Sequence, residues 1–346
     1  MSSEDQSNEH RSAGERASEE RASPPDEASA DPSERAEPGA AGEAARDARD
    51  EKSIDALEHG GLPVTAQQRL AEMESAGGTW TSDLSVAELA AIRGLGLQPL
   101  GLVMGSSVYR VASQWGYQWA GQFGGGYQRV YPCPHMYRHD DMRTGYNWEH
   151  VQYGRGVQAA RNLAMSRLEA EAHELGAHGV AGVRLTLKGL EQTGGLVEFT
   201  AIGTAVRRVG APPLERPFTS HLSGQELAKL IGTGYVPTAL VMGICAIEMD
   251  PGCGTEWRQG SFMNTEVPQL VDAAQACRHV AVEHLEQEAA RSGDHVIGVE
   301  VSFDIHHLVG EAKLFEFRAL GTAVRRFADT PMPTPPLVML RLADKR

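Results

Sequence analysis

An internal repeat runs through this 346-residue chain and limits the architectures that it can adopt. Two pairs of segments are alike at a spacing of 138 residues: Leu84–Gly94 with Leu222–Gly232, and the Leu-Val-Met-Gly stretches at 102–105 and 240–243. The copies also end alike, in Gly-Thr-Ala-Val-Arg-Arg, but there the spacing is 118 residues. Self-similarity of this kind indicates one structural unit that is used twice. We therefore expect two similar modules, the first of which contains about twenty additional residues.

Both copies begin with the same signal for the start of a helix. Ser85 and Ser223 are each followed three residues later by Glu. In such a capping box the Ser side chain accepts a hydrogen bond from an unpaired backbone N–H of the first turn, and the Glu side chain accepts one from the backbone N–H of the Ser. Each copy is therefore predicted to start with a short helix that ends at a glycine.

The remaining pattern predicts one long helix and three strands in each copy. Apolar residues recur every three or four positions over 156–175 and 266–290, which indicates helices. A β-rich run at 100–111 or 238–249 and a closing pair of strands show the alternation that strands require. The fold class is therefore α+β, with two tandem β-α-β-β modules, each a small antiparallel sheet plus a helix, and each preceded by a short helix.

A module of this kind has a structural weakness. Three strands bury little apolar surface and leave two sheet edges unpaired. We therefore expect the modules to associate with a neighbour, and this expectation rests on the strand count alone.

The first 60 residues differ in composition from the rest of the chain. They hold 7 Lys and Arg against 17 Asp and Glu, and no aromatic residue. Such a segment cannot bury enough apolar surface to offset the entropy lost on folding, so residues 1–60 are predicted to be a disordered acidic tail, either for interaction or for solubility alone. The other expected boundaries are module 1 at 80–209, a Pro-rich linker at 210–217, module 2 at 218–327 and a Pro-rich C-terminal tail at 328–346.

Composition and motifs exclude several classes of function. Outside the tail, 25 Lys and Arg stand against 29 Asp and Glu, so we expect no basic surface for nucleic acid. There is no apolar run long enough to span a membrane and no secretory signal segment. Four cysteines are too few for a disulfide scaffold, which favours a cytoplasmic protein. No nucleotide-binding glycine loop, nucleophile elbow or His-Glu-x-x-His motif occurs, so we assign no catalytic residues and expect no enzyme.

Three stretches together are typical of a known family. They are the Leu-Val-Met-Gly strand, the segment Leu175–Val183 that reads Leu-Gly-Ala-His-Gly-Val-Ala-Gly-Val, and the closing Gly-Thr-Ala-Val. With these, each copy resembles the YbjQ family of small bacterial proteins, which is described as heavy-metal-binding. The resemblance covers about two thirds of the chain, residues 97–208 and 235–326, although the middle stretch of the second copy keeps only its Gly-Val end. It implies modules related to the dodecin subunit and assembled as homopentamers, and it implies no catalytic residues.

The tandem arrangement restricts how such modules can assemble. Because five is odd, chains of two modules cannot tile a single ring of five. One solution is a pentamer of chains in which each of two stacked rings receives one module from every chain, and the other is a change in the ring number. We expect self-association, with a pentamer of two-module chains as the hypothesis.

The additional stretch in the first copy, residues 113–153, is rich in aromatic side chains. Ten of the 21 aromatic residues of the chain lie between Trp115 and Tyr153. Rigid aromatic rings are favoured both at interfaces and in ligand pockets. The insert is therefore either a binding loop or a small separate core that folds over module 1.

The same insert contains the best candidates for metal ligands, Cys133, His135 and His139. One thiolate and two imidazoles suit zinc or copper, with Asp140 or water as a fourth ligand. The alternative is a surface loop whose histidines are incidental, since the sequence has no Cys-x-x-Cys motif.

Three interpretations of function follow. The leading one is a non-enzymatic, ring-forming binding or scaffold protein with metal as its ligand. The second is a small-molecule binder or an enzyme whose pocket lies between subunits and is lined by the aromatic insert. In the third, the modules only assemble and the acidic tails recruit a partner.

Overall fold

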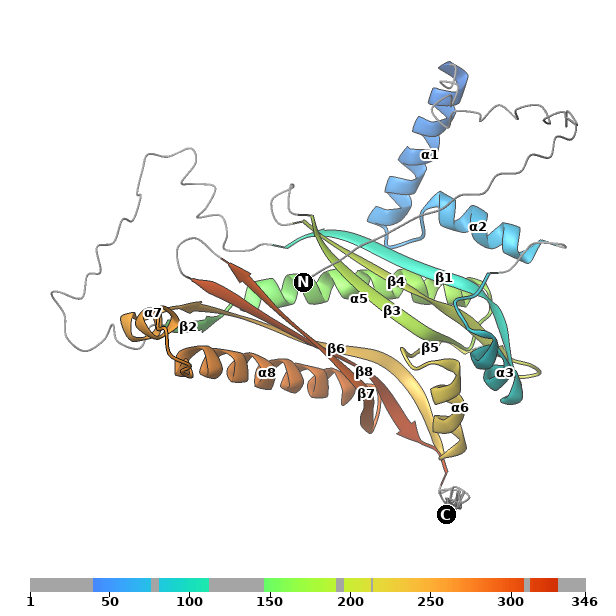
Figure 1. The fold of residues 1–346 in the computed structure, drawn as a ribbon. Coiled ribbons are helices and arrows are strands. Elements are labelled where there is room, and N and C mark those ends of the chain that lie inside the picture. The colour runs from blue at the N-terminus through green and yellow to red at the C-terminus, as the bar shows by residue number, and fades with distance from the viewer. Residues whose placement is uncertain are drawn as a thin grey trace, which may run out of the picture. The chain divides into compact units, whose positions relative to one another are not determined.

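The computed structural model describes residues 40–75, 81–111, 146–190, 196–212, 214–307 and 312–328. The chain divides into a short N-terminal unit, Met1–Asp47, and a large unit, Ala48–Arg346. Helix α1 (Ala40–Glu58) starts in the first unit and ends in the second. The described part of the large unit contains two β-sheets of four strands each (Figure 1).

Helix α1 falls within the segment that composition predicts to be disordered. Its sequence is dominated by Ala, Glu, Asp and Arg, of which Ala, Glu and Arg have high intrinsic helix propensity. A segment can therefore be helical without burying much apolar surface. A low content of apolar residues predicts little burial but does not exclude such a helix. Residues 1–39 lie outside the described residues.

Two parts of the large unit share a series of elements, namely short helix, strand, long helix, strand, strand (Figure 1). Before the long helix the first part also has the short strand β2 (Tyr146–Glu149), and the second part has the short helix α7 (Cys253–Gln259). We call these parts module 1 and module 2. Module 1 comprises α3 (Val86–Gly94), β1 (Leu97–Arg110), α5 (Val151–Glu174), β3 (Gly179–Leu190) and β4 (Leu196–Arg208). Module 2 comprises α6 (Gly224–Gly232), β6 (Tyr235–Asp250), α8 (Pro268–Ala289), β7 (His295–His307) and β8 (Lys313–Arg326). The predicted α+β fold class is confirmed.

Local sequence signals explain most element boundaries. Both predicted capping boxes are present, because Ser85 and Ser223 each accept a hydrogen bond from the backbone N–H three residues later while the Glu at that position bonds back. The long helix of module 1 starts at Val151, five residues before the predicted start, and includes the last residues of the aromatic insert. Among the described residues, no helix has the length and hydrophobicity needed to cross a bilayer.

A glycine in the first strand of each module lets the long helix approach the sheet closely. A Cβ atom added at Gly105 would overlap the backbone carbonyl of Ala164, and one added at Gly243 would overlap that of Ala281. Any larger residue would therefore push helix and strand apart. The fourth position of the repeated Leu-Val-Met-Gly stretch is thus explained by a helix–strand contact.

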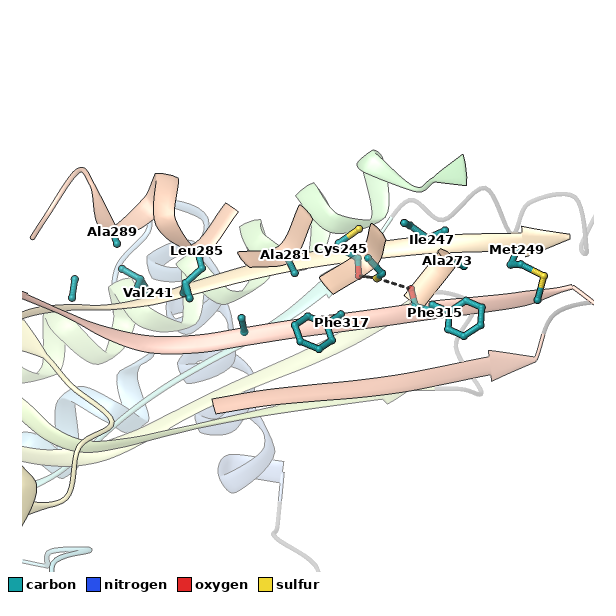
Figure 2. Packing of buried hydrophobic residues seen from close by; sticks show 13 residues of the cluster. Val241, Cys245, Ile247, Met249, Ala273, Ala281, Leu285, Ala289, Phe315 and Phe317 are labelled. Atoms are coloured by element: carbon teal, nitrogen blue, oxygen red, sulfur yellow. Dashed lines mark hydrogen bonds between the residues drawn. The ribbon is translucent and has the colours of Figure 1, made fainter. Parts of the chain in front are cut away.

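The core of module 2 lies between α8 and strands β6 and β8 (Figure 2). Phe315 and Phe317 are buried there beside Leu285. Cys245 and Cys277 are free and buried in the same cluster, and the Sγ atom of Cys277 donates to the carbonyl oxygen of Cys245 at 3.3 Å. These two cysteines are therefore small core residues.

The two sheets exchange short strands. Strand β2 (Tyr146–Glu149) follows the insert of module 1 but pairs antiparallel with β6 of module 2. Strand β5 (Phe218–Thr219) precedes α6 of module 2 but pairs parallel with β3 of module 1. The strand orders are therefore β1-β4-β3-β5 and β2-β6-β8-β7 (Figure 1). Each module closes one edge of its partner's sheet.

Candidate functional site

The predicted metal ligands Cys133, His135 and His139 lie outside the described residues, as does most of the aromatic insert. Within the described ranges, no three His, Cys, Asp or Glu side chains come together in a way that could hold a metal ion. The candidate site is therefore the surface on which the end of the insert meets module 2.

The insert ends on module 2. Strand β2 places Tyr146 opposite Asp250 and Glu149 opposite Ile247. The next backbone N–H, that of His150, donates to the carbonyl oxygen of Ala246 at 2.8 Å. Helix α5 then begins and lies against the β6 face that is turned away from α8.

The apolar part of this interface is fully buried. Val157 and Ala160 of α5 form one cluster with Met242 and Ile244 of β6. Side chains on a strand alternate between faces, and the neighbouring positions of β6 belong to the core under α8. Helix α5 is therefore covered by its own sheet on one side and by the sheet of module 2 on the other.

A polar network joins the modules at the start of α5. The Oη atom of Tyr153 donates a 2.6 Å hydrogen bond to Oε2 of Glu316 on β8, whose side chain is only 3% exposed. The same carboxylate lies 3.3 Å from Nε2 of His306 and 3.2 Å from Nε of Arg318. Arg318 also pairs with Asp304, at 2.5 Å. The Tyr153 side chain of module 1 thus bonds to Glu316 of module 2, which is itself paired with His306 and Arg318.

The network shifts the pKa values of its members. Burial and the adjacent Glu316 carboxylate raise the pKa of Tyr153 above its ordinary range. Burial by itself would raise the pKa of Glu316, but hydrogen bonds from His306 and Tyr153 together with the charge of Arg318 outweigh it, so that the pKa falls below its ordinary value. The hydrogen bond to Glu316 raises the pKa of His306. Glu316 is therefore a carboxylate that is stabilised in its charged form.

A second network anchors the middle of α5. Nη1 of Arg161 lies 2.6 Å from Oε1 of Glu288 on α8, and Nη2 donates to the carbonyl oxygen of Leu240. Nε2 of Gln158 donates to the other carboxylate oxygen of Glu288, at 3.0 Å. That oxygen also accepts the backbone N–H of Met242 at 3.1 Å. Arg161 is almost completely buried, so this ion pair is part of the interface core.

A groove of about 310 Å³ runs beside these contacts, between α5 and α8. It is lined by residues of both helices and of the β6 face between them, including Arg155, Gln158, Met242, His284, Gln287 and Arg291. The groove lies entirely at the boundary between the modules.

The side chains of this site pair with one another across and beside the module boundary. Tyr153 and His306 contact Oε2 of Glu316, whereas Oε1 of Glu316 and Nε of Arg318 are buried without a hydrogen-bond partner and meet as an ion pair at 3.2 Å. The cluster also does not suit a metal ion, because the guanidinium of Arg318 already pairs with both Glu316 and Asp304. The arrangement holds two modules together.

Glu316, Arg318 and Arg161 of this interface are not among the candidate residues that the sequence patterns indicate. Glu316 interrupts the apolar segment Leu314–Phe317, and a carboxylate at such a position is a signal for a buried partner. Arg161 lies next to the apolar stripe of α5, where a charged residue is equally compatible with solvent exposure. Neither signal identifies a partner more than 100 residues away in the chain.

Comparison with known proteins adds three similarities. Residues 140–209 match the YbjQ family, which is described as "Putative heavy-metal-binding". The chain is 33% identical to the encapsulin nanocompartment protein Rv1762c of Mycobacterium tuberculosis over 289 residues, which cover 82% of this chain and 98% of that protein. Two UPF0145 proteins, from two strains of Thermus thermophilus, are each 41% identical over 66 residues, which cover 19% of this chain and 56% of each relative.

Proposed function

The chain belongs to the same protein family as the encapsulin nanocompartment protein Rv1762c, and on this basis we propose that it is a non-enzymatic, self-associating binding or scaffold protein of an encapsulin nanocompartment. The observation that carries the proposal is the extent of the similarity, which spans 98% of that relative. The geometry is compatible with it, because polar contacts join the two modules within the chain and the modules therefore have surfaces that dock on one another. The cytoplasm is the expected location.

The association with nanocompartments can be tested in the source cells. The expected result is that the chain sediments with encapsulin nanocompartments purified by density gradient and resists added protease until the compartments are disrupted. A matched sample from cells that lack the encapsulin shell protein controls for aggregation. Free chain at the top of the gradient in both samples would contradict this part of the proposal.

Self-association is a separate part of the proposal. Both halves of the chain are taken as YbjQ-like modules of the dodecin-subunit type, a resemblance that implies homopentamers of modules. Because each chain has two modules, we propose five chains with ten modules, and a different ring number is the alternative. Native mass spectrometry or mass photometry of the untagged chain should give a single large species of that size. A monodisperse monomer near 37.3 kDa at every concentration would overturn it.

Metal binding is the second candidate function, and the sequence of the insert favours it. We propose zinc or copper as the metal and Cys133, His135 and His139 as the ligands. The Cys133→Ser, His135→Ala double variant should lose stoichiometric metal in elemental analysis, whereas Cys253→Ser should keep it. Equal metal content in wild type and double variant would reject this site. A coloured organic ligand in the purified protein would instead favour a small-molecule site lined by the aromatic insert.

A further inference from the structure

The interface inside the chain is directional, because the two modules contribute different surfaces to it. Module 1 contributes the outer face of α5 and the strand β2 before it. Module 2 contributes the face of β6 turned away from α8 and the β6 edge that does not pair with β8. We call the first the donor surface and the second the acceptor surface. If the modules are alike, module 2 should also have a donor surface and module 1 an acceptor surface.

The close contacts of Gly105 and Gly243 define which helix positions are equivalent. Gly105 contacts Ala164 of α5, and Gly243 contacts Ala281 of α8. Equivalent positions of the two helices are therefore 117 residues apart in the sequence. This offset aligns Arg161, the anchor of the donor surface, with Arg278. It also aligns Gln158 with Gln275, so both anchoring residues recur on α8. Arg278 and Gln275 are exposed, so the outer face of α8 carries a copy of the donor surface. The Arg278 guanidinium stacks over the Phe303 ring of its own module, 5.2 Å from the ring centroid, and would leave this ring to bind a carboxylate on another copy.

The acceptor surface recurs on module 1 and is open there. On β6, Met242 and Ala246 are 4% and 1% exposed because α5 covers them. Their equivalents on β1, Met104 and Val108, are 39% and 59% exposed. Among the described residues, the face that is buried in module 2 is therefore exposed at these two positions in module 1.

The strand pairing shows the same asymmetry. Strand β6 pairs with β2 along its outer edge, whereas β1 pairs only with β4 among the described strands. The offset of 117 residues makes Met263–Glu266 the equivalent of β2. This segment is exposed and forms no strand, although it precedes α8 as β2 precedes α5. The described part of the chain thus contains both a strand edge without a partner and the segment that is equivalent to the strand on the corresponding edge of β6.

Helix α2 (Val64–Glu74) provides the most specific evidence for what binds here. On module 2, the guanidinium of Arg161 joins the Glu288 carboxylate to the Leu240 carbonyl. On module 1, Arg69 of α2 joins the equivalent Glu171 carboxylate to the equivalent Leu102 carbonyl, the latter at 2.8 Å. Arg69 therefore occupies the place that an incoming donor arginine would take.

We propose that copies of this chain associate head to tail, with the donor surface of module 2 on one copy docking on the acceptor surface of module 1 on the next. In this contact Arg278 replaces Arg69 at Glu171, so α2 competes with assembly. The proposal rests on the self-association part of the proposed function and adds its direction, its residues and an internal competitor. A second copy is the occupant that matches, because the chain repeats both halves of an interface that it already makes internally. Such a heterologous contact gives closed rings or open filaments. The number of modules in either assembly is even because each chain has two.

Cross-linking between copies tests the contact directly. Inside the chain, Gly154 lies beside Ile244, since a Cβ added to it would be 4.0 Å from the Ile244 side chain. The equivalent pair across copies is Val271 and Ser106. Val271→Cys and Ser106→Cys chains, purified separately and then mixed with a short bis-maleimide, should give a heterodimeric product. Wild type and each variant alone supply the background from the native cysteines. A mixture that gives no product above this background would overturn the docking geometry.

Two substitutions test the competition in the full-length chain. Arg278→Ala should raise the concentration for half-assembly at least tenfold, measured by mass photometry and sedimentation velocity. Arg69→Ala should lower it by a similar factor. Arg69→Ala removes a partner of the buried Glu171, so its effect on folding needs a check by a variant at an exposed side chain. Val108→Asp is this variant, and like Arg278→Ala it should raise the concentration for half-assembly tenfold or more. Lys188→Ala, at an exposed position of β3, is the control.

The outcomes separate this inference from the proposed function. If the chain assembles but Arg278→Ala, Arg69→Ala and Val108→Asp all leave the half-assembly concentration unchanged, the head-to-tail contact is wrong and self-association stands. If neither wild type nor Arg69→Ala assembles at any concentration, both the head-to-tail contact and the proposed self-association are wrong. Opposite shifts for Arg278→Ala and Arg69→Ala support the contact together with the role of α2.

Discussion

The phenol of Tyr153 and the carboxylate of Glu316 join the two modules through a 2.6 Å hydrogen bond. These residues are 163 positions apart in the sequence, and Glu316 is almost completely buried. A hydrogen bond to a buried charged group contributes more to stability than one between neutral groups, so this contact is a sensitive point of the interface.

Tyr153→Phe should therefore destabilise the chain by about 1.5–3 kcal/mol, because a buried carboxylate loses a donor while the ring remains in place. Urea denaturation monitored by circular dichroism measures the free energy of unfolding. Tyr109→Phe is the matched control, since Tyr109 lies at the exposed end of β1. Equal stability of the two variants would show that the hydrogen bond contributes nothing.

Replacing Arg161 with Met should cost about 2–4 kcal/mol of unfolding free energy. The substitution keeps much of the apolar stem but removes the cation that pairs with Oε1 of Glu288 and the donor to the Leu240 carbonyl. Arg155→Met, on the same helix and exposed, should change stability by less than about 0.5 kcal/mol. Chemical denaturation measures the unfolding free energy of both variants. A larger loss for Arg155→Met than for Arg161→Met would contradict the prediction.

The histidine of the Tyr153 network should make stability depend on pH. Folding raises the pKa of His306 above its ordinary value of 6.5, so the stabilisation is fully present below that pH and is lost as the pH rises through the folded-state pKa. Folding lowers the pKa of Glu316 below its ordinary 4.5, so its contribution is present above pH 4.5 and is lost as the pH falls through the folded-state pKa. The network is therefore most stabilising between pH 4.5 and 6.5.

The difference in unfolding free energy between wild type and His306→Gln should accordingly be larger at pH 5.5 than at pH 8.5. Since His306 is partly exposed, we expect the change to be less than about 1 kcal/mol. His307→Gln controls for the substitution itself, because adjacent strand residues point to opposite faces. A difference that grows from pH 5.5 to pH 8.5 would contradict the assignment.

Gly243→Ala should destabilise module 2 by about 3 kcal/mol or more, because the added Cβ overlaps the backbone of α8 rather than a movable side chain. Gly94→Ala is the control, since a Cβ there meets nothing within 4 Å. Thermal unfolding of both variants measures the effect. A Gly243→Ala chain as stable as Gly94→Ala would show that helix and strand can separate at no cost.

Much of the fold follows from local sequence signals. A capping box needs only Ser and Glu three residues apart, and both boxes form as predicted at Ser85 and Ser223. Alternating apolar residues likewise indicate β7, in which Phe303 and Ile305 face Phe317 and Phe315 in the register. These features depend on neighbours within a few positions, so the sequence alone determines them.

The candidate site could not be derived in this way. Its predicted ligands, Cys133, His135 and His139, belong to the part of the chain that the structure does not describe. The interface instead depends on contacts such as Tyr153 with Glu316 and Arg161 with Glu288, and no local pattern connects residues more than 100 positions apart.

The sequence by itself determined that one α+β unit occurs twice, where its helices start, and that its few strands leave edges in need of partners. Only the tertiary structure decided which partners those edges receive. It placed β2 on β6 and α5 against the sheet of module 2, while Arg69 of α2 took the equivalent position on module 1. The physical reason is that helix caps and strand alternation are set by neighbouring residues, whereas an open edge or apolar face can be covered by any complementary surface. The choice among such surfaces is made by packing and charge pairing in three dimensions.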